Sequence, residues 1–82
     1  MDKIDLIYEF KKNSLEKIAI QFGEFNGIKL INLRVFYLVD AFNSEWRPSS
    51  KGIMMDIKNI PELKKGIDKA YEKWRKSSEP QP

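Results

Sequence analysis

The sequence predicts an α+β fold, a four-stranded antiparallel β-sheet followed by one C-terminal α-helix. Apolar residues recur at period two through much of residues 1–57, as they do in half-buried strands. An Asn-Gly pair at residues 26–27 separates two such segments, which is typical of a type I′ hairpin. Residues 58–76 then change to the spacing of an amphipathic helix. Short connections between neighbouring strands favour antiparallel pairing.

Two strands are expected before the Asn-Gly pair. In residues 1–12 the alternating apolar residues are expected to share one face of a strand: Ile4, Leu6, Tyr8 and Phe10. Asn13-Ser14 is expected to form the turn that follows. In residues 16–25 the core-facing set is Ile18, Ile20 and Phe22.

The second half of the chain is expected to supply two more strands and the helix. Residues 28–39 form a long strand, residues 40–50 a polar loop containing Pro48, and residues 51–57 a short strand. Asp56 or Asn59 is expected to cap the helix, with Pro61 in its first turn. The helix is expected to cover one face of the sheet and to leave the other open.

Composition limits the functions open to this chain of 82 residues, a length that predicts a single domain. We expect that domain at residues 1–76 and a disordered tail at 77–82. Cysteine and histidine are both absent, which removes thiolate metal ligands and the commonest general base. Phosphate-loop, dinucleotide and nucleophile-elbow motifs are also missing. The sequence therefore predicts a protein that is not an enzyme and has no metal, cofactor or small-molecule substrate.

The sequence contains no segment typical of a signal peptide or a membrane span. We expect a soluble protein without a membrane partner, cytoplasmic (nucleoid-associated) if bacterial and nuclear if eukaryotic. The net charge is +3, but residues 1–50 contain seven basic and seven acidic residues. The excess lies in residues 51–82, so no broad basic patch is expected on the sheet.

One face of the strand at residues 28–39 is the most informative. It places Asn32, Arg34 and Phe36 in line, and an arginine beside an exposed aromatic is a typical surface for single-stranded nucleic acid. The alternative is that Phe36 covers a core edge and Arg34 pairs with a glutamate. Phe25 and Trp46 have similar alternatives, either stacking on a ligand or packing within the chain.

The helix carries a broad apolar stripe that includes Leu63, Ile67, Tyr71 and Trp74. These residues either complete an intramolecular core or form a dimer interface, because large aromatics are costly to leave exposed.

Several blocks of sequence resemble the positive cofactor 4 family of transcriptional coactivators, in particular its short bacterial members. The blocks are EFNG at 24–27, LINLRVFY at 30–37, EWRPSSKGI at 45–53 and PELKKGI at 61–67. The resemblance implies four antiparallel strands, a long helix that pairs in a homodimer, and a channel for single-stranded DNA or melted duplex. It also implies DNA contacts by Phe25, Arg34, Tyr37 and Lys51. Strand alternation, however, places Tyr37 on the other face of the strand from Arg34. Either a twist or bulge turns Tyr37 toward the face of Arg34, or Phe36 takes its role.

Together these features predict a homodimer that binds single-stranded DNA without sequence preference, in transcription regulation or DNA maintenance. The alternatives are a protein-interaction module with the same fold and an RNA-binding protein. The predicted dimer interface is Leu63, Ile67, Tyr71 and Trp74. The predicted DNA-binding residues are Phe25, Asn26, Lys29, Asn32, Arg34, Phe36, Tyr37, Trp46, Arg47 and Lys51.

Overall fold

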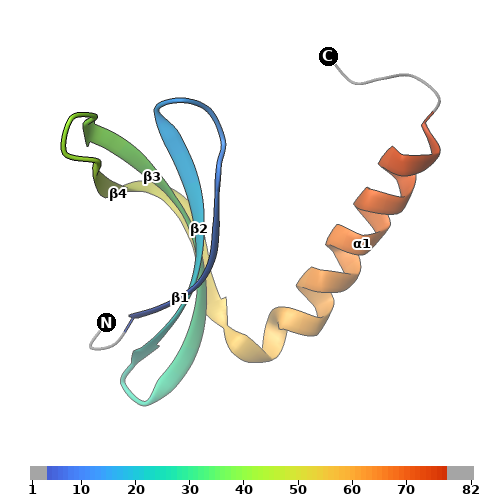
Figure 1. Cartoon of the computed structure of the whole chain (residues 1–82). Helices are drawn as coiled ribbons and strands as arrows, with labels where there is room; N and C mark the ends of the chain where they lie inside the picture. Colours follow the sequence, from blue (N-terminus) through green and yellow to red (C-terminus); the bar gives the residue numbers. More distant parts are fainter. Residues whose placement is uncertain (1–3, 78–82) are drawn as a thin grey trace.

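The computed structural model describes residues 4–77, which form one antiparallel sheet and a C-terminal helix (Figure 1). The order of strands in the sheet is β1-β2-β3-β4, so each strand pairs with its neighbour in sequence. The predicted fold class is confirmed. Apart from Ser77, the predicted tail lies outside the described residues. The elements are β1 (Ile4–Lys11), β2 (Glu16–Phe25), β3 (Ile28–Asp40), β4 (Glu45–Asp56), the 3₁₀ turn η1 (Ile57–Asn59) and α1 (Ile60–Lys76).

The hairpin between β2 and β3 follows the sequence prediction. Asn26 and Gly27 both have positive φ, at 53° and 78°, as a type I′ turn requires. Pairing then runs without interruption from Phe25 opposite Ile28 to Glu16 opposite Tyr37. Because β2 and β3 stay in register, alternation along these two strands is a reliable guide to which face each side chain occupies.

The predicted common face of β1 is wrong. The register shifts between Leu6, which lies opposite Gln21, and Tyr8, which lies opposite Ile20. This bulge puts Ile4 and Leu6 on one face of the sheet and Tyr8 and Phe10 on the other.

The predicted loop at residues 40–50 is also wrong, because β4 begins at Glu45 and the turn spans only residues 41–44. Pro48 interrupted the apolar pattern, but β4 is an edge strand, where a residue without an N–H is tolerated. The turn is held by Asp40, whose Oδ1 accepts from the backbone N–H groups of Phe42 and Asn43. The Asn43 side chain donates to Asp40 Oδ2, and these bonds from Asn43 and Phe42 lower the pKa of Asp40.

The sheet has two chemically different faces. The centre of the helix-side face is apolar and carries Ile18, Ile20, Ile31, Leu33, Val35 and Ile53. The outer face, which looks away from α1, carries Ala19, Gln21, Asn32, Arg34 and Phe36. Figure 1 shows that the ends of the strands bend away from α1, so the outer face is concave.

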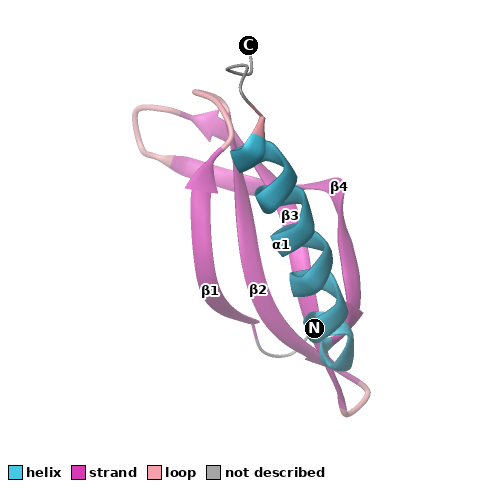
Figure 2. Cartoon of the chain, turned by 90° about the vertical axis from the view of Figure 1, so that its right-hand side faces the viewer, coloured by secondary structure: helices cyan, strands magenta, loops and turns pink. Residues whose placement is uncertain are grey.

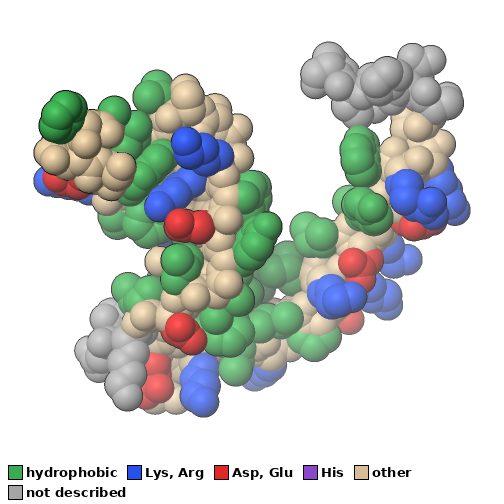
Figure 3. Space-filling model, viewed as in Figure 1, with side chains coloured by type: hydrophobic (Ala, Val, Ile, Leu, Met, Phe, Trp, Pro, Cys, Tyr) green, Lys and Arg blue, Asp and Glu red, His purple; other side chains and the backbone are tan. Residues whose placement is uncertain are grey.

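The predicted packing of the helix on the sheet is wrong. Seen from the helix side, α1 crosses in front of β2 and β3 (Figure 2), but in Figure 1 the two diverge. Pro61 lies in its first turn and Asp56 caps the preceding η1, whereas Asn59 makes no side-chain cap. No residue of α1 is buried, and hydrophobic side chains line the side of α1 that faces the sheet (Figure 3). Along most of its length the apolar stripe therefore has no partner among residues 4–77.

The described chain buries very little of its apolar surface. Among residues 4–77, Ala19 and Ile31 are the only buried hydrophobic residues. A groove of about 660 Å³ separates α1 from the helix-side face, and Leu33, Ile53 and Leu63 are among its lining residues. A small domain needs a larger core than this to be stable alone.

Candidate nucleic-acid interface

A polar network on the outer face holds Arg34 in place. Arg34 Nε and Nη2 donate to Asn32 Oδ1 at 3.3 and 3.1 Å, and Nη1 donates to the Ser49 carbonyl at 3.2 Å. Asn32 Nδ2 donates to Gln21 Oε1 at 3.1 Å. Asn32 is only 4% exposed, so it is a buried support for the guanidinium. The network spans β2, β3 and β4.

Arg34 keeps its charge and part of its donor capacity. Within residues 4–77 no carboxylate pairs with it, so the predicted alternative of a pairing glutamate is wrong. The three nitrogens use three of five N–H donors within the described chain. The remaining two donors are available to an acceptor such as a phosphate or a base edge.

Gly52 makes this position of Arg34 sterically accessible. It lies directly opposite Arg34 in the ladder between β3 and β4. A Cβ at Gly52 would come within 2.6 Å of the Leu33 carbonyl oxygen and 2.8 Å of Arg34 Cζ. The backbone carbonyl has little freedom to move, so a side chain at residue 52 would distort both the ladder and the guanidinium.

Replacing Gly52 with alanine is therefore expected to lower the free energy of unfolding by about 1–3 kcal/mol, the usual cost of overpacking. Urea denaturation measures the effect. Gly66→Ala is the matched control, because a Cβ there meets nothing within 4 Å and alanine favours a helix interior by about 1 kcal/mol. A Gly52→Ala protein as stable as the unmodified chain would contradict the steric argument.

Three predicted aromatics lie on the outer face with Arg34. Phe36 is two residues after Arg34 on β3. Trp46 on β4 lies opposite Leu38 of β3, so it shares the outer face. Phe25 lies beside the turn at the other end and is 58% exposed. Because β3 keeps its register with β2, Tyr37 remains on the helix-side face. Phe36, and not Tyr37, is therefore the aromatic beside Arg34.

Three of the predicted basic residues lie on the helix-side face instead. Lys29 lies opposite Glu24 in the ladder between β2 and β3, and Arg47 lies opposite Tyr37 in the ladder between β3 and β4. Lys51 precedes Gly52, so its side chain leaves the sheet on the side opposite Arg34. Arg47 Nη2 also forms an exposed ion pair with Glu45 Oε2 at 2.8 Å. The predicted site is thus divided between two faces, with Asn26 in the turn at their edge.

The charge of Lys51 acts on Glu16, the first residue of β2. Hydrogen bonds from Asn13 and Lys12 lower the pKa of Glu16, and the charge of Lys51 adds a smaller effect in the same direction. Glu16 lies opposite Tyr37, which agrees with the helix-side position of Lys51.

Sequence reasoning missed Lys17 and Glu9, which meet on the outer face. Lys17 Nζ lies 3.1 Å from Glu9 Oε2 and 4.8 Å from the centroid of the Trp46 ring. Alternation in residues 16–25 places Lys17 on the face of Ala19, and this signal was available in the sequence. The bulge in β1 and the pairing of β3 with β4, which bring the partners together, were not.

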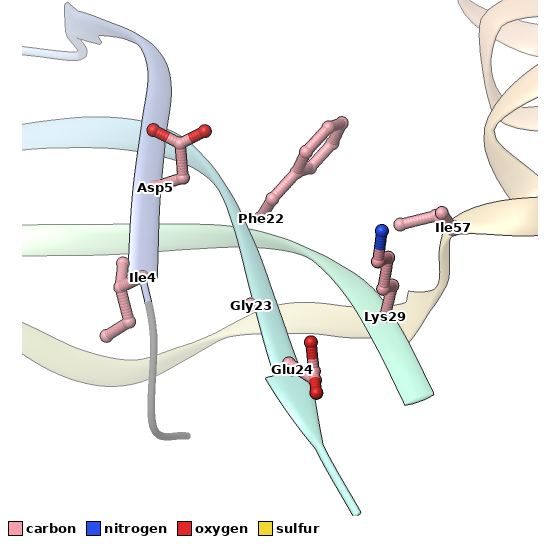
Figure 4. Close-up of a pocket in the computed structure, with 7 residues that line it drawn as sticks. All are labelled: Ile4, Asp5, Phe22, Gly23, Glu24, Lys29 and Ile57. Atoms are coloured by element: carbon pink, nitrogen blue, oxygen red, sulfur yellow. The ribbon is translucent and has the colours of Figure 1, made fainter. Parts of the chain in front are cut away.

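A separate pocket of about 580 Å³ lies near the β2–β3 hairpin, and Phe22, Lys29 and Ile57 are among its lining residues (Figure 4). The described residues contain no group of three or more acidic side chains that could hold a metal ion. No helix between residues 4 and 77 is long and apolar enough to cross a membrane.

Comparison with known proteins assigns the family. The family profile described as Transcriptional Coactivator p15 (PC4) matches residues 10–67, which is more than half of the chain. The chain belongs to this family. The PC4 match begins near the end of β1 and ends in α1, so it includes all of β2, β3 and β4 but leaves out residues 4–9 of β1. A search of curated proteins found no significant match.

Solved structures with the PC4 fold agree. A PC4 homolog from Burkholderia pseudomallei K96243 superposes with a TM-score of 0.76 at 20% identity, over 87% of this chain and 93% of that one. Its tetragonal crystal form gives a TM-score of 0.74 at 16% identity, over 84% and 98% of the two chains. The bacteriophage T5 homolog of PC4, implicated in recombination-dependent DNA replication, gives 0.61 at 18% identity, over 89% and 81%.

Proposed function

We propose that the protein binds single-stranded DNA on the outer face of its sheet, without sequence preference and without catalysis. The observation that carries this proposal is Arg34, an arginine with no carboxylate partner in the described chain that is held by buried Asn32 beside Phe36. A fixed cation next to aromatic rings is suited to a strand that offers phosphates and unpaired bases together. Duplex DNA keeps its bases stacked and cannot use the rings in this way.

The proposed site is smaller than the set predicted from sequence. It includes Phe25, Asn32, Arg34, Phe36 and Trp46, which share the outer face. Arg47 and Lys51 are left out because they lie on the other face. Membership of the PC4 family and the likeness to the T5 homolog support a role in transcription regulation or DNA maintenance.

The working unit of this function is proposed to be a homodimer, built from a single domain at residues 1–76. The stripe on α1 contains Leu63, Ile67, Tyr71 and Trp74; the last three are exposed, and Leu63 and Ile67 line an apolar groove. The α1 helix of a second copy is the proposed occupant, because it supplies an apolar surface of the same length. Pairing α1 in this way would bury the stripe and leave both outer faces open.

Fluorescence polarisation with labelled oligonucleotides tests the DNA proposal. We expect oligo-dT and a mixed single strand to bind within a few-fold of each other, and both at least about tenfold more tightly than duplex. The logarithm of the affinity should fall with the logarithm of salt concentration, by about 0.7 per phosphate contact. Equal affinity for duplex, or no binding at low salt, would contradict the proposal. Tighter binding of a matched RNA would indicate RNA as the ligand.

A further inference from the structure

The ammonium group of Lys17 lies between two partners on the outer face. Glu9 Oε2 on β1 is 3.1 Å from Lys17 Nζ, and the centroid of the Trp46 ring on β4 is 4.8 Å away. Phe36 on β3 lies directly opposite Lys17 in the ladder. The cluster therefore draws on all four strands and adjoins the aromatic that flanks Arg34.

The position of Lys17 has two consequences for a ligand. Its charge is neutralised by Glu9, so it does not attract a phosphate as a free lysine would. Its ammonium also covers one face of the Trp46 ring, so a base cannot stack on that face while Lys17 stays there. Trp46 is available on that face only after Lys17 has moved.

Neither contact is strong enough to fix Lys17 permanently. The Lys17 side chain is 19% exposed and that of Glu9 is 40% exposed, so water and salt reach the pair. Partly exposed ion pairs and cation–π contacts are individually weak. A backbone phosphate brought close by Arg34 would compete with Glu9 for the same ammonium group.

We propose that Lys17 is a phosphate-binding residue restrained by Glu9, and that its movement to a phosphate uncovers Trp46 for a nucleobase. This inference rests on the proposed function, because it assigns a second subsite to the same face. The ligand must carry a phosphate and an unstacked base close together, which a single strand does and inorganic phosphate does not. Glu9 acts as an internal competitor that weakens binding to any ligand unable to fill both positions.

A double-mutant cycle tests the restraint. We expect Glu9→Gln to bind oligo-dT about two- to fivefold more tightly than the unmodified protein, the range that exposed ion pairs support. Lys17→Met keeps the length of the apolar stem and is expected to weaken binding by a similar factor. The double variant should bind like Lys17→Met alone, because Glu9 then has nothing to restrain. A gain from Glu9→Gln that persists in the Lys17→Met background would overturn the proposal.

A charge control excludes a general electrostatic effect. Asp68→Asn raises the net charge by the same amount and removes a carboxylate that pairs with Lys64 at 2.7 Å on α1. Its affinity for oligo-dT should be unchanged, and a gain equal to that of Glu9→Gln would overturn the proposal. Lys17→Met should also reduce the salt slope by about 0.7, the value of one phosphate contact to a single strand.

Tryptophan fluorescence follows the second step. The chain has two tryptophans, so the difference between the unmodified protein and Trp46→Phe isolates the signal of Trp46. We expect oligo-dT to quench this signal, and an abasic strand or inorganic phosphate to leave it nearly unchanged. An unquenched Trp46 at saturating oligo-dT overturns the subsite but leaves the Arg34 site standing. Failure of the unmodified protein to bind any oligonucleotide overturns the proposed function itself.

Discussion

Arg34→Ala is expected to weaken binding of single-stranded oligonucleotides by about ten- to a hundredfold. Hydrogen bonds to charged groups contribute about 1.5–3 kcal/mol, and each 1.4 kcal/mol is a factor of ten in affinity. Arg34 has no carboxylate to neutralise it in the described chain and is already positioned by Asn32, so little ordering cost opposes the contact. Fluorescence polarisation with oligo-dT measures the loss.

Part of any loss of affinity in Arg34→Ala will come from a lower stability of the unbound protein. The change leaves Asn32 Oδ1 and the Ser49 carbonyl without their donor, which costs about 1–3 kcal/mol when such groups are buried. Urea denaturation should therefore accompany the binding assay, at concentrations where the variant is folded. Arg34→Lys keeps the charge but loses the planar guanidinium. Its affinity for oligo-dT should lie between that of the unmodified protein and that of Arg34→Ala.

Arg47→Ala is the matched control that tests whether DNA binds to the outer face or to the helix-side face of the sheet. It removes the same charge from the neighbouring hairpin strand, but Arg47 lies on the helix-side face and pairs with Glu45. Its affinity for oligo-dT should stay within about threefold of the unmodified protein, as is usual for an exposed ion pair. A loss equal to that of Arg34→Ala would move the site to the helix-side face. A folded Arg34→Ala protein with full affinity would refute the site altogether.

The fold could be predicted from the sequence where local signals decide the structure. Asn26-Gly27 determines the turn type through positive φ, and the turn fixes the register of β2 and β3. The bulges could not be predicted, because they depend on pairing between strands. The shift in β1 puts Ile4 on the face opposite Tyr8, and the shifts between β3 and β4 leave Pro48 paired with Phe36 within a continuous strand.

The same physical distinction applies to the site. Asn32, Arg34 and Phe36 are on one strand, so alternation alone brings them together. The sequence groups Lys51 and Arg47 with Arg34 as basic residues of one site. The irregular pairing of β4 with β3 decides which face each of them occupies. The contact between Lys17 and Trp46 joins β2 to β4 across an intervening strand, and no periodicity within one segment reveals it.

The second large effect is expected from the helix. Ile67→Lys should convert a dimer into monomers and lower the melting temperature. Ile67 is 61% exposed in the single chain, in the middle of the α1 stripe. Burying an isoleucine side chain is worth about 1.5–3 kcal/mol. A two-fold interface loses that contribution twice, so the dimer should dissociate at least about a hundredfold more readily.

Dimerisation and folding should be linked in this protein, because Ala19 and Ile31 are the only buried hydrophobic residues between 4 and 77. The melting temperature of the unmodified protein should then rise with protein concentration, as mass action requires. Sedimentation equilibrium gives the oligomeric state, and circular dichroism at several concentrations gives the linkage. Lys69→Gln, on the other side of α1 by helical spacing, is the control and should remain dimeric. A monomeric unmodified protein whose melting temperature is independent of concentration would show that the stripe has another partner.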